Sequence, residues 1–376
     1  MKKTVLFLVV LSLLVFSSVG LAVEKGGELI VGLEDDPPML DPHLSTAKVD
    51  RQVFQSLYDT LVEVNENMEI VPGLAKDWKV SDDGTRYVFE LRNDVKFHDG
   101  TKFNAEAVKF NFERMLDDKL ASPRKSELDL ITKIEVIDEY KLAVNLEKSF
   151  TPFLASLADR AGMMVSPTAV KKLGDDFANN PVGSGPFKFV EREIQDKIEL
   201  EKFADYWKEG LPYLNKVTYK PFPDGNVRIV NLTNGELDMI GDVPPKDLRK
   251  LKTNPDIEVD MTSGLGFQGI WVNKAKMPLK DNNLAQALSK SIDKEAVVKV
   301  VFGEAAIPAD SPYPPGTSMH NEDRKIEGVD PVAAKKHLNK AGKPDGFELN
   351  LMVAPNPTAK QTAQLIQAMA SNVGIK

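Results

Sequence analysis

The stretch that decides the fold is Gly73–Phe110, which reads GLAKDWKVSDDGTRYVFELRNDVKFHDGTKFNAEAVKF. A turn at Ser81–Gly84 precedes the run Arg86–Arg92, whose large apolar residues alternate with polar ones as in a strand with one buried face. Asn104 is a good N-cap, and apolar residues recur after it at helical spacing. The stretch therefore predicts strands and a helix in close succession, as in a mixed α/β chain.

The same signals continue on both sides of this stretch. Alternating or short apolar runs predict strands at Glu28–Gly32, Arg86–Arg92, Lys141–Glu147, Phe187–Val190, Lys216–Lys220, Gly266–Asn273 and Phe347–Val353. Helical spacing and caps predict helices at 49–62, from Asn104, from Asp293 to Gly303, from Asp330 to Gly342 and at about 358–372. The alternation favours sheets with one solvated face over a fully buried parallel sheet.

Composition excludes several classes of function. The chain has 376 residues, enough for two or three domains, and its 42% hydrophobic and 28% charged residues are typical of a globular protein. A net charge of −8 gives no basic excess for nucleic acid. The absence of cysteine removes disulfides and thiolate chemistry, and four histidines leave little for a zinc site.

The N-terminus has the pattern of a secretory signal peptide at residues 1–22. Lys2 and Lys3 precede an apolar run, Val5–Phe16, and Gly20–Ala22 supplies small residues for cleavage after Ala22. The alternative is a membrane anchor, but the run is shorter than the roughly 20 residues that a bilayer requires. Without a lipid-accepting cysteine, we expect an exported protein that is not lipid-anchored.

Motifs for catalysis are missing. Ser184 lies in Pro181–Gly185, where the glycine spacing of a nucleophile elbow is not met. We find no paired-histidine zinc motif, phosphate-binding loop or dinucleotide fingerprint. Ser81–Gly84 and Asp224–Asn226 lack the acidic pattern of a calcium loop and are interpreted as turns. We therefore expect no catalytic residue, no metal, no cofactor and no enzymatic activity.

The three tryptophans are candidates for a binding surface. Trp78 and Trp207 are interpreted as core residues, because a typical tryptophan is mostly buried. Trp271 lies among glycines in Gly266–Asn273, and glycine within a strand often marks close approach by a ligand. For Trp271, ligand contact and core burial remain equally open.

Taken together, these segments resemble the family 5 extracellular solute-binding proteins, the substrate-binding components of dipeptide, oligopeptide and nickel ABC importers. The resemblance extends from about Gly27 to Lys376. Its motifs are Gly73–Arg92, Val95–Phe110, Leu40–His43, Pro181–Phe187, Gly235–Met239, Asn273–Pro278, Ala285–Ser289 and Ile292–Lys294.

The resemblance implies a type II-like periplasmic-binding-protein clamp with two lobes and an extra subdomain on the first. Lobe I would comprise residues 23–45 and 175–261, the extra subdomain 46–174, and lobe II would begin at 262. Members of the family continue for well over a hundred further residues. We therefore expect the second lobe, residues 262–376, to be incomplete, as in a truncated member of the family.

The resemblance also implies a ligand site. In lobe I it includes the loop residues Asp36, Pro38, Met39 and Leu40, and in lobe II Gln268, Gly269 and Trp271. The alternative is that the loop only joins elements and that the second segment is a core strand. The turn Gly183–Gly185 is expected to be structural, at the point where the chain re-enters lobe I.

The implied function is capture of a peptide in the cleft between the lobes and its delivery to the membrane permease subunits of an ABC importer. We expect a periplasmic monomer. Alternatives from the same family are an oligosaccharide ligand stacked on Trp271 and a fragment without function. Nickel is disfavoured, because no cluster of metal ligands appears. A secreted hydrolase with an unfamiliar site is the alternative from another class, and turnover of peptide or sugar would distinguish it.

Overall fold

The computed structural model describes residues 25–262, 264, 266–315, 317 and 319–376. The expected signal peptide, residues 1–22, lies outside these residues. The chain divides into two compact units, the first ending at Gly241 and the second spanning Asp242–Lys376. Each unit is described by itself.

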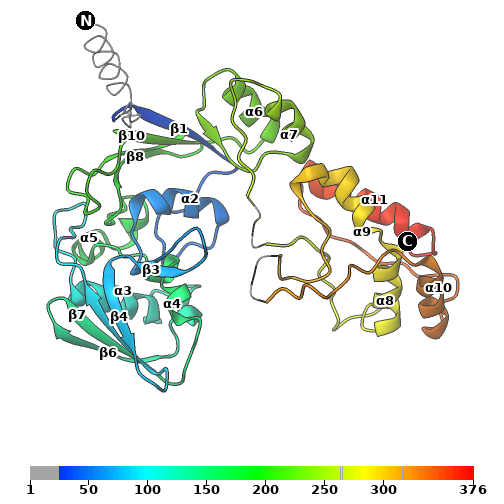
Figure 1. Cartoon of the computed structure of the whole chain (residues 1–376), viewed down its shortest axis with the longest axis horizontal. Helices are drawn as coiled ribbons and strands as arrows, with labels where there is room; N and C mark the ends of the chain where they lie inside the picture. The colour runs from blue at the N-terminus through cyan, green and yellow to red at the C-terminus, as the bar shows by residue number, and fades with distance from the viewer. Residues whose placement is uncertain (1–24, 263, 265, 316, 318) are drawn as a thin grey trace, which may run out of the picture. The chain divides into compact units, whose positions relative to one another are not determined.

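A five-stranded mixed sheet organises the first unit (Figure 1). Its order is β11 (Met239–Ile240), β1 (Glu28–Leu33), β10 (Lys216–Pro221), β9 (Lys197–Lys202) and β8 (Phe187–Glu193). Strand β1 runs parallel to both of its neighbours, whereas β10, β9 and β8 pair antiparallel. The strands predicted at Glu28–Gly32, Phe187–Val190 and Lys216–Lys220 are confirmed as β1, β8 and β10, although β8 extends three residues beyond its predicted end.

Helix α2 (Lys48–Leu57) packs on this sheet and buries Val53, Phe54 and Leu57 completely. The prediction of a helix to residue 62 was too long. Tyr58 adopts an extended backbone, and Leu61 packs in a different core from α2. The helix therefore ends where the chain passes from one core to the other.

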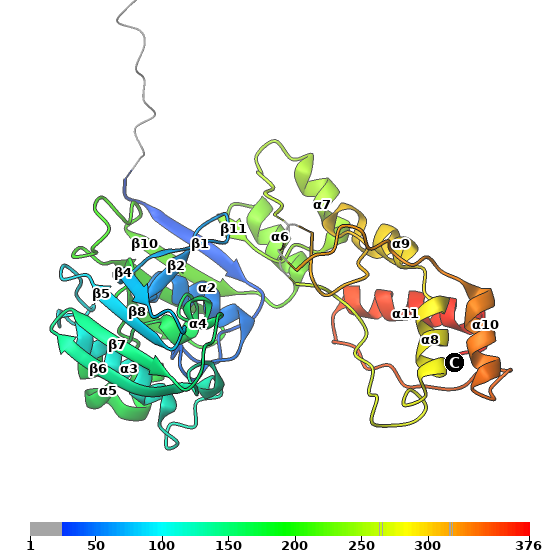
Figure 2. The same ribbon diagram turned by 60° about the horizontal axis from the view of Figure 1, so that its bottom comes forward.

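The second sheet of this unit is antiparallel, in the order β4 (Ala75–Val80), β5 (Arg86–Leu91), β7 (Lys141–Leu146) and β6 (Ile131–Asp138). It lies against α3 (Ala105–Leu116), as Figure 2 shows. The predicted cap of α3 is confirmed, since the Asn104 side chain accepts a hydrogen bond from the Ala107 amide at 3.0 Å.

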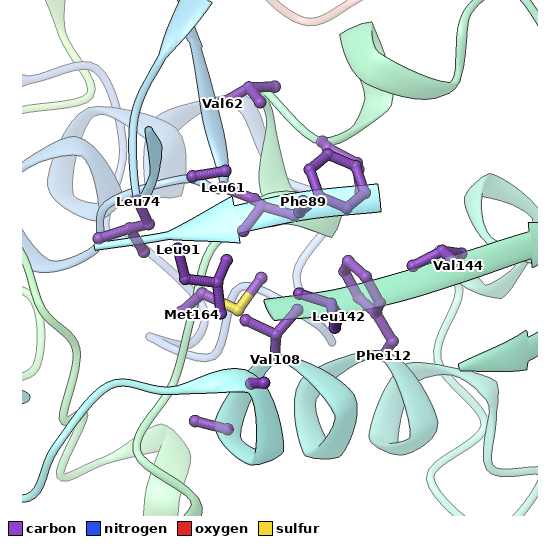
Figure 3. Close-up of a cluster of buried hydrophobic side chains, with 14 of the residues drawn as sticks. Leu61, Val62, Leu74, Phe89, Leu91, Val108, Phe112, Leu142, Val144 and Met164 are labelled. Atoms are coloured by element: carbon purple, nitrogen blue, oxygen red, sulfur yellow. The ribbon is translucent and has the colours of Figure 1, made fainter. Parts of the chain in front are cut away.

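Apolar side chains from the sheet and α3 form a dry core (Figure 3). Phe89 and Leu142 from the sheet meet Val108 and Phe112 from the helix, and all four are fully buried. Burial of each such side chain contributes about 1.5–3 kcal/mol to the stability of the folded state. The stretch Gly73–Phe110 thus supplies much of one independent core, as its alternation and helical spacing predict.

The remaining strands and α-helices of the first unit are short. They are the hairpin β2 (Val62–Val64) and β3 (Ile70–Pro72), and the helices α4 (Phe153–Ser156), α5 (Pro167–Leu173) and α6 (Gly225–Thr233). Residues of α2 and α5 pack in the core of the five-stranded sheet, although both helices lie within 46–174, the range expected for the extra subdomain.

Helices dominate the second unit. They are α7 (Pro245–Lys252), α8 (Asn282–Ser291), α9 (Lys294–Val297), α10 (Pro331–Lys340) and α11 (Pro357–Ser371). A small core joins α8, α10 and α11 through residues such as Leu288, Leu338 and Ala370. The predicted caps are confirmed: Asp293 and Asp330 accept the amides of Ala296 and Ala333.

Two predicted strands of the second unit are wrong. Neither Gly266–Asn273 nor Phe347–Val353 forms a strand in the part of the chain that the structure describes, apart from a bridge between Phe347 and Ile375. A strand depends on a neighbour for its backbone hydrogen bonds. Alternation of apolar and polar residues indicates which side chains could be buried, but it does not indicate whether a neighbouring strand is present.

Within the same described ranges, no helix combines the length and apolar character needed to cross a membrane.

Candidate functional site

The loop between β1 and α2 contains four of the predicted ligand-binding residues. Pro38 is exposed and Met39 is half-buried, so their side chains are available at the surface of the first unit. Asp36 is also half-buried, whereas the Leu40 side chain is completely buried in the core. Only part of the predicted set therefore presents a side chain to solvent.

Asp36 is fully engaged within the protein. Its Oδ1 accepts a hydrogen bond from Arg192 Nη2 at 3.0 Å, and its Oδ2 accepts the Gln195 amide at 2.9 Å. Arg192 Nη2 also donates to the Pro37 carbonyl. The side chains of Arg192 and Asp36 are 10% and 16% exposed, so this ion pair is largely shielded from water. These contacts tie the loop to the hairpin formed by β8 and β9.

The backbone of Leu40 is anchored from two directions. Its amide donates to the Ala178 carbonyl at 3.1 Å, and its carbonyl accepts the hydroxyl of Tyr58 at 2.7 Å. Tyr58 is itself buried, and burial raises the pKa of its hydroxyl well above the usual value. Leu40 thus fixes the end of the loop, leaving Pro38 and Met39 as its outward part.

A buried polar cluster follows the loop. Arg114 Nη2 and Nη1 donate to the two carboxylate oxygens of Asp41 at 2.5 and 3.1 Å, and Nη1 also donates to His43 Nδ1 at 2.8 Å. His43 Nε2 donates to the Met163 carbonyl at 3.1 Å, so the ring is a neutral Nε2–H tautomer. Burial lowers the pKa of His43 to about 4. The cluster joins the loop to α3.

The turn Gly183–Gly185 is held between two segments, in agreement with a structural role. His98 Nδ1 accepts the Gly183 amide at 3.2 Å and His98 Nε2 donates to the Gly185 carbonyl at 3.0 Å, while the Gly185 amide donates to the Leu57 carbonyl. A Cβ at Gly183 would lie 2.0 Å from Leu57 O. Burial lowers the pKa of His98 to about 4.

Trp78 and Trp207 both pack, partly buried, against the core around α3. The indole of Trp207 is fixed further, because its Nε1 donates to Asp59 Oδ2 at 2.8 Å and the Arg92 guanidinium lies 4.3 Å from its ring centre. Their predicted role as packing residues agrees with this placement.

The second predicted segment lies in the second unit and is open to solvent. Gln268 and Gly269 are exposed, and Trp271 is 87% exposed. The rings of Phe267 and Trp271 are 5.9 Å apart with an interplanar angle of 50°. Of the two readings of Trp271, core burial is not what the structure shows. The exposed aromatic pair offers two apolar ring faces, inclined to each other, of the kind that ligand sites use.

Arg192 was missed by sequence reasoning. Strict alternation in β8 puts it on the face opposite Phe187 and Phe189. A bulge between Phe189 and Glu191 shifts the register, so that Arg192 pairs with buried Ile198. A bulge re-aims the side chains that follow it. No signal in the sequence marks this one.

Searched over the residues that it describes, the structure contains no group of three or more histidine, aspartate or glutamate side chains placed to hold an ion.

Comparisons with known proteins agree on one family. The model for bacterial extracellular solute-binding proteins, family 5 Middle, matches residues 69–376. The glutathione-binding protein GsiB of Shigella flexneri is 33% identical over 350 residues, covering 93% of this chain and 68% of that protein.

Solved structures give the same result. The periplasmic binding protein DppA from Helicobacter pylori, in complex with the peptide STSA, aligns with a TM-score of 0.87 and 30% identity over 96% of this chain and 74% of its own. The dipeptide-binding protein from Pseudoalteromonas sp. SM9913, in complex with Met-Leu, aligns with a TM-score of 0.85 and 27% identity, covering 93% and 75% of the two chains. The mixed α/β fold is therefore that of periplasmic binding proteins.

Proposed function

We propose, from the premise that this chain belongs to the family 5 bacterial extracellular solute-binding proteins, that it captures a short peptide for import. Membership makes it a solute-binding protein of an ABC transporter and not an enzyme. The proposal has four further parts. They are a peptide ligand, a periplasmic location after removal of residues 1–22, a monomeric state, and permease subunits as partners.

The observation that carries the peptide assignment is the similarity to DppA with bound STSA, which extends over 96% of this chain. The Met-Leu complex of a second relative supports the same class of ligand. GsiB, named for glutathione, adds a relative whose ligand is itself a small peptide-like molecule. A peptide-class solute is common to these three relatives.

Within this proposal, residues 23–45 and 175–261 form lobe I, residues 46–174 the extra subdomain, and residues 262–376 contribute to lobe II. Pro38 and Met39 are the proposed ligand contacts of lobe I. Gln268, Gly269 and Trp271 are the proposed contacts of lobe II, supported by their exposure. Asp36 and Leu40 serve the site by holding the loop, since their polar groups are engaged within the protein.

Calorimetric titration of residues 23–376 tests the ligand class. The probes are STSA, Met-Leu and glutathione, with maltotriose as the competing class. We expect saturable binding of at least one peptide probe, with the probe recovered intact. Binding of maltotriose alone would transfer the assignment to oligosaccharides, and cleavage of a probe would contradict a binding function.

A further inference from the structure

Arg192 contacts the loop after β1 directly before two of the proposed ligand contacts. We propose that Arg192 is a positioning residue for ligand capture: it holds Asp36 and Pro37 so that Pro38 and Met39 are presented at the surface. This inference rests on the proposed function of the loop.

The first support is the local geometry of the guanidinium. A single nitrogen, Arg192 Nη2, donates both to Asp36 Oδ1 at 3.0 Å and to the carbonyl of Pro37. These acceptors are adjacent in the chain, so one cation fixes a carboxylate and the following peptide group together. Charge-assisted hydrogen bonds are roughly twice as strong as neutral ones.

The second support is the completeness of the contacts at Asp36. The other oxygen, Oδ2, accepts the Gln195 amide at 2.9 Å. Gln195 lies in the turn between β8 and β9, where its φ of 64° is positive. Both carboxylate oxygens are therefore committed to one hairpin, and the loop is attached there at two points.

The third support is the bulge that places Arg192. Without the register shift between Phe189 and Glu191, Arg192 would project from the opposite face of β8. The shift puts it on the face of Ile198, toward α2 and the loop. The bulge in the edge strand β8 thus places the Arg192 guanidinium against Asp36 and Pro37, just before the exposed Pro38.

Lys188 provides a matched control on the same strand. It also forms an ion pair, with Glu201 at 2.8 Å, but the two side chains are 39% and 53% exposed and neither contacts the loop. Exposed pairs contribute little. Removing either cation changes the net charge equally, so Lys188→Met separates the effect of charge from the loss of the contact between Arg192 and the loop.

The experiment compares Arg192→Met, Asp36→Asn, their double variant and Lys188→Met, with STSA as the probe. We expect each of the first two changes to weaken binding about tenfold, mainly through faster dissociation. The double variant should be no weaker than either single one, because both remove the same contact. Lys188→Met should bind like the unaltered protein, and Arg192→Lys should recover part of the affinity.

Hydrogen exchange of the Leu40 amide, which donates to the Ala178 carbonyl, gives an independent readout in the ligand-free protein. We expect faster exchange in Arg192→Met and Asp36→Asn than in Lys188→Met. If the unaltered protein does not bind STSA, the proposed function loses its support while the exchange rates still decide the role of Arg192. Unchanged exchange together with unchanged affinity, or additive losses in the double variant, would overturn the inference.

Discussion

The indole nitrogen of Trp207 donates to the carboxylate of Asp59 at 2.8 Å, across 148 positions of sequence. Asp59 follows α2, and Trp207 lies between β9 and β10, so the bond joins two distant parts of the first unit. Tyr206 donates to the other oxygen of Asp59 at 3.0 Å. Asp59 is 7% exposed, and its burial raises the pKa of the carboxyl to about 6.

Trp207→Phe should destabilise the protein, because it removes one of the two side-chain donors to a buried carboxylate. We expect a loss of about 1–3 kcal/mol in the free energy of unfolding, measured by chemical denaturation. Trp271→Phe is the control: that side chain is 87% exposed, and its replacement should stay within about 0.5 kcal/mol. Equal effects of the two changes would contradict the role given to the Asp59 contact.

Removal of the Arg114 side chain should lower the free energy of unfolding more than Trp207→Phe does. Its side chain is 9% exposed and that of its partner Asp41 only 1%, so Arg114→Met leaves a buried carboxylate without its cation. We expect a loss of about 3–5 kcal/mol. Lys109→Met, on the same helix, breaks only an exposed pair with Glu113 and should cost well under about 1 kcal/mol. Comparable denaturation midpoints for the two variants would rule the argument out.

The pH dependence of stability has a defined sign at His98. Its pKa is about 4 in the folded protein against 6.5 for the free side chain, so the unfolded state binds the proton more readily. Stability from this group is present above pH 6.5 and is lost as the pH falls toward 4, by about 2 kcal/mol between pH 7 and 5.

The contribution of Asp59 to the pH dependence of stability has the opposite sign. The pKa of its carboxyl is raised in the folded protein, so its stabilising effect is lost as the pH rises through 6. The test for His98 is therefore a difference. We expect the stability of His98→Asn to fall less between pH 7 and 5 than that of the unaltered protein. A parallel dependence in both proteins would show that His98 takes up its proton equally in the two states.

Gly185→Ala should distort the chain at the turn Gly183–Gly185, just before β8. A Cβ there would lie 2.6 Å from the carbonyl carbon of Leu57 and 2.7 Å from the Tyr58 nitrogen, and backbone atoms cannot rotate away. We expect a loss of about 1–3 kcal/mol. Gly241→Ala is the control, because no atom lies within 4 Å of its added Cβ. Tolerance of both changes would contradict the tight packing of this turn.

Local rules predicted much of the fold, because several elements carry their own signal. Asn104 and Asp330 cap helices through bonds to residues only three positions away. The alternation at Arg86–Leu91 is realised in the centre of a sheet, where both edges are paired. At such positions the local preference and the tertiary packing agree.

The predictions that were wrong or missing share a physical cause: these features depend on residues that are distant in the sequence. Phe347–Val353 alternates but has no ladder, and the role of Arg192 depends on a bulge that periodicity does not reveal. The candidate site was predicted from resemblance. The structure shows which of the predicted site residues are exposed, such as Pro38, and which bond to other residues of the protein, such as Asp36.

The central claim is that this chain binds a peptide without converting it. Native mass spectrometry of residues 23–376, purified without denaturation and then incubated with a mixture of STSA and Met-Leu, tests it most directly. The account predicts a compact monomer carrying one intact peptide. A compact monomer that remains free of peptide, or the appearance of hydrolysed products, would contradict it.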